Sequence, residues 1–223
     1  MNLALKIGKF YKGKFRMKII FLHGLGQDET SWNEVIKVLP NHDCLSVKLF
    51  ERDVFPTDFK VLEDKVLSIL ESIDEDFILV GLSLGGMLAL DMIQFNLANL
   101  KGIVVSGGQY KMKGNLAFYM QYLLFACTPA QVFEKQGVDK HAMKSFYGGL
   151  SQFNLAKVLT EVELPVQLIC GQNDKANLPA AKAMHKLMTN SQLNIIPDSG
   201  HVLNTECPDD FANIIKNFLN RIM

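Results

Sequence analysis

The sequence has no net charge, because 23 lysines and arginines match 23 aspartates and glutamates. A protein of this kind has no long-range field to attract nucleic acid or an anionic membrane, so neither partner is expected. Arginine is scarce and occurs as Arg16, Arg52 and Arg221. A bidentate guanidinium clamp for a carboxylate or phosphate is therefore not expected either.

There are only four cysteines, Cys44, Cys127, Cys170 and Cys207, and they form no CxxC pair and no cluster with histidine. This pattern argues against a zinc or thiol redox site and predicts reduced thiols, as is typical of a cytoplasmic protein. Cys170 ends the apolar run VQLIC and is expected to fill space in the core.

No apolar run is long enough to cross a membrane. The longest uncharged one lies between Asp76 and Asp91, whereas a helix needs roughly 20 apolar residues to span about 30 Å of hydrocarbon. Residues 1–16 are basic, but the run IIFL that follows is too short for the core of a signal peptide. Two interpretations of residues 1–16 stay open, a poorly ordered extension and an irregular edge hairpin.

The 223 residues, of which 48% are hydrophobic, are enough for one substantial core, and we expect a single domain. Six short segments are nearly continuous apolar runs, which is typical of strands buried on both faces. Stretches with helical spacing separate them. The alternation predicts an α/β fold with a mostly parallel sheet and helices on both faces. The predicted strands are 17–23, 44–50, 77–82, 101–106, 166–171 and 193–197.

Residues 109–160 interrupt this alternation with an aromatic and methionine-rich tract, LAFYMQYLLFAC, followed by a polar stretch. No linker rich in proline or glycine sets the segment apart. We therefore expect an inserted helical cap that packs on a core formed by residues 17–108 and 161–223.

The tract FILVGLSLGGMLALDMI contains the motif Gly81-Leu82-Ser83-Leu84-Gly85 between a predicted strand and a predicted helix. A serine hydroxyl is a weak nucleophile, and a sharp turn presents it where a base and a ligand can both reach it. The glycines allow the backbone to approach closely there. Ser83 is therefore the candidate nucleophile, and the alternative is an ordinary turn serine.

A nucleophilic serine needs a base, and histidine has the side-chain pKa nearest neutrality. His201 follows the predicted strand LNII in the loop PDSGH, on the edge where the other strands also end. His23 also ends a strand and is the weaker candidate. His42 and His185 are expected at the surface and His141 in the cap, so we choose His201.

Asp174 lies in ICGQND after the fifth predicted strand. From there it can hold the imidazole in the productive tautomer and stabilise its charged form. Asp198 is closer to His201 in sequence but is expected to shape the PDSG turn. The backbone N–H groups of Leu25 and Leu84 are the candidate donors to an oxyanion.

Through FLHGLG, VGLSLGG, ICGQND and PDSGHVLNTECPDDF, the sequence resembles the α/β-hydrolase superfamily, particularly compact bacterial carboxylesterases. The order of nucleophile, acid and histidine along the chain agrees. The resemblance implies an acyl-enzyme mechanism without metal or organic cofactor. Ser83 would attack a carbonyl, His201 would move the proton, Asp174 would orient the imidazole, and water would release the acid. Serine at this position argues against dehalogenases and epoxide hydrolases, which use an aspartate nucleophile.

A neutral, apolar ester is the expected substrate, since no arginine lies in the cap or the motif loops. Three alternatives stay open: a thioesterase or amidase with the same triad, a lyase that uses the triad as acid and base, and a non-catalytic ligand receptor. A stripe of the cap is a candidate wall for an acyl pocket, although plain packing is the more common role of such a stripe. It consists of Phe118, Tyr119, Tyr122, Leu123, Leu124 and Phe125.

Overall fold

The computed structural model describes residues 17–51, 55–134 and 139–223, so both interpretations of residues 1–16 lie outside the described residues. Six strands form one sheet in the order β2-β1-β3-β4-β5-β6, and every neighbouring pair is parallel. The predicted α/β fold is confirmed. The strands are β1 (Lys18–Leu22), β2 (Cys44–Val47), β3 (Phe77–Leu82), β4 (Leu100–Ser106), β5 (Val166–Gly171) and β6 (Ser191–Ile196).

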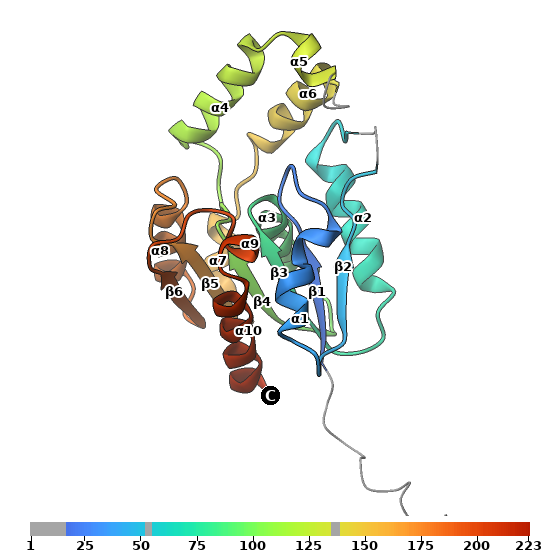
Figure 1. The fold of residues 1–223 in the computed structure, drawn as a ribbon, viewed down its shortest axis with the longest axis vertical. Helices are drawn as coiled ribbons and strands as arrows, with labels where there is room; N and C mark the ends of the chain where they lie inside the picture. Colours follow the sequence, from blue (N-terminus) through green and yellow to red (C-terminus); the bar gives the residue numbers. More distant parts are fainter. Residues whose placement is uncertain (1–16, 52–54, 135–138) are drawn as a thin grey trace, which may run out of the picture.

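Helices cover both faces of the sheet (Figure 1). Successive side chains of a strand point to opposite faces, so Ile19 and Phe21 pack toward α10, whereas Ile20 and Leu22 pack toward α2 and α3. One face carries α1 (Asn33–Lys37), α9 (Leu203–Glu206) and α10 (Pro208–Ile222), with the 3-10 helix η1 (Glu29–Trp32). The other carries α2 (Phe59–Glu71), α3 (Leu84–Asp91), η2 (Met92–Phe95), α7 (Ala156–Glu161) and α8 (Leu178–Leu187).

The edge strands differ from the sequence expectation. β1, β3, β4 and β5 are almost entirely buried, as predicted. The prediction of burial on both faces is wrong for β2 and β6, because most of their side chains are half-exposed or exposed. The physical reason is that an edge strand has one neighbour only and the helices cover it incompletely.

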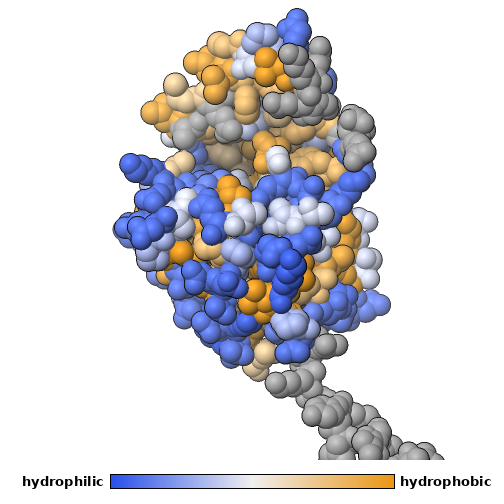
Figure 2. Space-filling view, viewed as in Figure 1, coloured by the Kyte–Doolittle hydropathy of each residue, from blue (hydrophilic) through white to orange (hydrophobic). Residues whose placement is uncertain are grey.

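Three helices between β4 and β5 stand over the carboxyl edge of the sheet, at the top of Figure 1. We call them the cap helices: α4 (Leu116–Cys127), α5 (Ala130–Glu134) and α6 (Lys140–Leu150). The rings of Phe55 and Phe146, 5.4 Å apart and edge to face, join α6 to the body of the molecule. Apolar residues gather over the cap helices in the space-filling view, and the surface is hollowed beneath them (Figure 2). None of the helices in the described part of the chain combines the length and apolar character needed to cross a bilayer.

Candidate active site

Ser83 lies at the turn from β3 into α3. Its φ of 54° and ψ of −114° form a conformation that residues with a side chain rarely adopt. Its N–H donates to the carbonyl oxygen of Ser106 at 2.8 Å and so fixes the turn against β4. The motif glycines are required by space: a Cβ on Gly81 would lie 2.2 Å from the carbonyl oxygen of Gly85, and one on Gly85 would lie 2.1 Å from that of Leu22. The strained turn presents the serine side chain at the carboxyl edge of the sheet.

His201 and Asp174 form a hydrogen-bonded pair, with 2.7 Å between Nδ1 and Oδ2. Asp174 is 6% exposed. Burial by itself would raise the pKa of Asp174, but hydrogen bonds from His201 and Asn177 outweigh burial and hold that pKa below its ordinary value. An ionised carboxylate that accepts the Nδ1 proton leaves Nε2 of the imidazole as the free acceptor.

Asp198, the competing acid, shapes the turn after β6. It has a positive φ of 54° and an exposed side chain. Its backbone N–H donates to Oε1 of Gln172 at 3.2 Å. Its carboxylate makes no hydrogen bond to His201, so the structure pairs the imidazole with Asp174.

A cavity of about 460 Å³ brings Ser83, Asp174 and His201 to one surface, together with Leu25 and Leu84. The hydrogen bonds of the His201 ring are made by Nδ1, and none of them reaches Ser83. Such nucleophile–base contacts are often long until a substrate closes the site. The cavity therefore holds all five candidate residues, and Ser83 and His201 form no hydrogen bond with each other in this structure.

The two candidate oxyanion donors follow different strands, β3 and β1. Leu84 is the first residue of α3, where a backbone N–H has no partner within the helix and the helix dipole favours negative charge. Leu25 follows β1 in the loop after Gly24. Among the described residues neither N–H has a hydrogen-bond acceptor. Both groups are free to donate into the cavity.

The cap contributes other side chains to the cavity than the sequence indicated. Of the predicted stripe, Phe118 lines it, while Tyr122 and Phe125 line a small crevice between α4 and α6. Tyr119, Leu123 and Leu124 are exposed, because α4 turns one face only toward the body. The pocket role considered for these three residues is therefore wrong. The apolar wall consists of Met87, Met112, Phe118, Phe146, Tyr147 and Leu150.

His23 has a structural role beneath the site. It is buried, with Nδ1 2.9 Å from the carbonyl oxygen of Gly24, and its Nε2 accepts the N–H of Leu49 at 3.1 Å. Burial lowers the pKa of His23, which favours the neutral ring. Because both nitrogens are engaged, this residue has no free acceptor for a serine proton.

Three residues of the site were missed from the sequence. Gly107 follows β4 with φ +57°, and a Cβ there would lie 2.8 Å from Cε1 of His201. Asn177 donates through Nδ2 to both Asp174 oxygens at 2.9 Å, and its Oδ1 accepts from Nε2 of Gln109 at 2.8 Å. The available signals were weak: a glycine after a strand, and an asparagine three residues beyond the acid.

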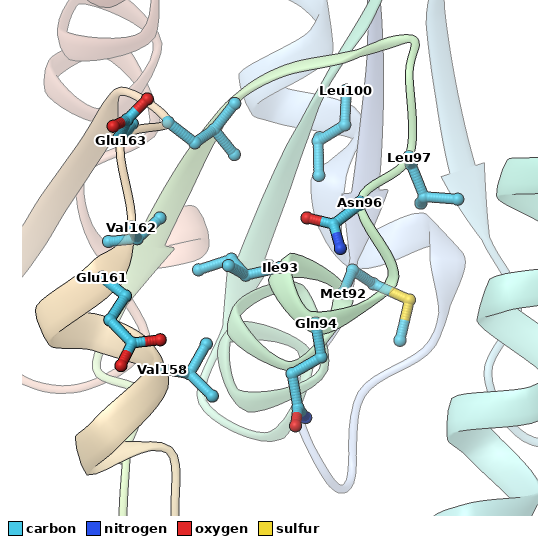
Figure 3. Close-up of a pocket in the computed structure, with 11 residues that line it drawn as sticks. Met92, Ile93, Gln94, Asn96, Leu97, Leu100, Val158, Glu161, Val162 and Glu163 are labelled. Carbon is cyan, nitrogen blue, oxygen red and sulfur yellow. The ribbon is translucent and has the colours of Figure 1, made fainter.

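A larger cavity, of about 660 Å³, lies at the opposite edge of the sheet (Figure 3). It is formed between η2 and the segment that runs from α7 into β5. Glu161 and Glu163 border it, and polar and apolar side chains share its lining. Its described lining contains no serine, cysteine or histidine, so it offers no hydroxyl or thiol nucleophile beside an imidazole base. Size alone does not make it the active site.

One class of α/β enzymes has a parallel sheet covered by helices, with a serine at a sharp strand-to-helix turn and a histidine–aspartate pair at the carboxyl edge. Residues 19–214 match the family model described as "Alpha/beta hydrolase family", and the chain belongs to that family.

Curated relatives match shorter stretches. The chain is 35% identical over 72 residues to a protein of Bacillus subtilis (strain 168), covering 32% of this chain and 26% of that one. It is 31% identical over 106 residues to one of Haemophilus influenzae, covering 44% of this chain and 43% of that one. Both are named putative 2-succinyl-6-hydroxy-2,4-cyclohexadiene-1-carboxylate synthases. The chain thus spans less than half the length of these relatives.

Solved structures match nearly the whole chain. MenH from S. aureus has a TM-score of 0.75 at 19% identity, covering 94% of this chain and 96% of that one. A lipase-esterase related protein from Clostridium acetobutylicum has a TM-score of 0.74 at 20% identity, covering 92% and 95%. A thermophilic esterase from Thermogutta terrifontis has a TM-score of 0.75 at 18% identity, covering 92% and 90%. At these identities the likeness establishes the fold.

Proposed function

We propose that the protein is a serine hydrolase that cleaves a neutral carboxylic ester through an acyl-enzyme intermediate. The observation that carries the proposal is the common cavity of Ser83, at a strained turn, and the buried Asp174–His201 pair. We also propose that segment 109–160 acts as a cap over this cavity.

The reaction follows from these positions. Ser83 Oγ attacks the carbonyl carbon while His201 Nε2 takes the hydroxyl proton, and Asp174 stabilises the imidazolium. The N–H groups of Leu25 and Leu84 donate to the oxyanion, an interaction worth about 3–4 kcal/mol for each donor. When the intermediate collapses, the alcohol leaves with the proton from His201. Water then attacks the acyl-enzyme with His201 as base, and the carboxylic acid is released.

The cavity supports a neutral substrate. Its described lining contains no lysine or arginine, and its cap side is mostly apolar. A carboxylate enclosed there would lose its hydration without a cationic partner, which is strongly unfavourable. Thioesters and amides would use the same catalytic groups. Comparison of kcat/KM for matched ester, thioester and amide substrates distinguishes the three activities.

A second candidate rests on the curated relatives, whose name describes a synthase that forms a cyclohexadiene carboxylate. That product carries two carboxylates. The described lining of the cavity offers no lysine or arginine to pair with these carboxylates, so we rank ester hydrolysis first.

The test is turnover of p-nitrophenyl acetate, butyrate and hexanoate by the protein and by Ser83→Ala. The proposal expects turnover that falls at least 10³-fold in the variant. Equal rates in both proteins would refute it. Calorimetric binding of the cyclohexadiene carboxylate, together with no turnover of any ester, would favour the synthase instead.

A further inference from the structure

The cap side of the active-site cavity holds a tyrosine hydroxyl with no partner among the described residues. Tyr147 is 4% exposed. Its ring is stacked on Phe118 at 5.5 Å and meets Phe125 edge to face at 5.2 Å. The ring is thus fixed by packing, and its hydroxyl has a defined direction.

That direction is toward the active site. Tyr147 borders two hollows, the active-site cavity and the small crevice between α4 and α6. The exposed walls of the crevice are almost wholly apolar, so the hydroxyl does not open into it. The hydroxyl oxygen itself stays accessible to solvent, so a ligand that displaces the water of the cavity has to supply its hydrogen-bond partner.

Asn115 provides a second free donor at the same cavity. Its Oδ1 accepts the N–H of Phe118 at 3.1 Å and caps α4. Its Nδ2 has no acceptor in the described chain. The other amides of the lining are used differently: Asn177 donates to Asp174, and Gln109 donates to Asn177.

The described lining of the active-site cavity holds no lysine or arginine, so its two neutral donors select a neutral acceptor oxygen. Building on the proposed function, we propose that the substrate is an ester whose cap-side part carries such an oxygen, an ether or ketone, bound by Tyr147 and Asn115. A purely aliphatic ester would leave both donors unsatisfied. A carboxylate would lack a counter-charge.

The experiment compares p-nitrophenyl hexanoate with three analogues in which an ether oxygen replaces the methylene at position 3, 4 or 5 of the acyl chain. The quantity measured is kcat/KM for each analogue relative to hexanoate, so intrinsic reactivity cancels between variants. In Tyr147→Phe this ratio should fall about 2- to 12-fold at one oxygen position, the effect of one hydrogen bond. Asn115→Ser keeps a capping oxygen, removes the amide donor and should shift the ratio in the same direction.

Tyr122→Phe is the matched control, because Tyr122 lies on α4 and lines the crevice, not the cavity. An unchanged ratio at all three oxygen positions in Tyr147→Phe would overturn the inference, as would an equal shift in the control. If the unmodified protein cleaves none of the esters, the proposed function fails by itself. In that case the inference about Tyr147 is tested by calorimetric binding of the matching methyl esters. Tyr147→Phe must weaken the binding of an ether-bearing methyl ester more than the binding of the plain one.

Discussion

Gly107→Ala should disable the site without unfolding the protein. The new methyl carbon would lie 2.8 Å from Cε1 and 2.9 Å from Nδ1 of His201, and 3.3 Å from Oδ2 of Asp174. The first two separations are shorter than real Cβ contacts allow, so the imidazole must move by several tenths of an ångström. Misplacing a catalytic group by about 1 Å can cost 10²-fold in rate. We expect kcat for p-nitrophenyl butyrate to fall about 30- to 100-fold.

The substitution also strains the backbone, because Gly107 has φ +57°. Alanine in this region costs roughly 1–2 kcal/mol. Gly114→Ala is the matched control, since Gly114 has φ +83° and a Cβ there would meet nothing within 4 Å. Both variants should lose similar stability in urea unfolding, and Gly107→Ala alone should lose kcat. If the two variants had equal kcat, the contact of Gly107 with the imidazole would have no catalytic meaning.

Two further predictions concern carboxylates. Asn177→Ala removes both Nδ2 hydrogen bonds to Asp174, so the pKa of that carboxyl should rise. The value of kcat should fall roughly 10- to 100-fold. The acid limb of the pH–rate profile should move to higher pH. A profile that superimposes on that of the unmodified protein would contradict this. Asp91 is 3% exposed, and burial, followed by the neighbouring Glu63, raises its pKa to about 7. Because the folded state keeps a proton that the unfolded state loses, this group's contribution is full below about pH 4 and is lost as pH rises toward 7. Asp91→Asn should therefore match the unmodified protein near pH 4 and be about 2–4 kcal/mol more stable at pH 8, measured by urea unfolding; a constant difference across pH would oppose the assignment.

Local patterns in the sequence were enough to predict the sheet. Apolar runs marked all six strands, and Pro208, which begins α10, marked the last helix correctly. Burial at the edges could not be predicted in this way, because the runs in β2 and β6 do not reveal which strands have one neighbour. Strand order is a property of the whole fold.

The candidate site was predictable where chemistry lies at strand ends. Ser83, Asp174 and His201 each follow a strand, and parallel strands bring their carboxyl ends to one edge. Asn177 and Gln109 could not be found, because their contacts depend on how α8 and the loop after β4 approach each other. The prediction of the residues that form the apolar wall was wrong for a related reason. Composition identifies an apolar helix but not the face that it turns toward the cavity.

The central claim is that Ser83 is a nucleophile activated by His201. The most direct measurement is the rate and site of labelling by a fluorophosphonate probe, followed by mass spectrometry of the modified peptide. We predict one label per chain, on Ser83, with a rate that drops at least 10²-fold in His201→Gln. Labelling at another residue, or an unchanged rate in the variant, would contradict the account.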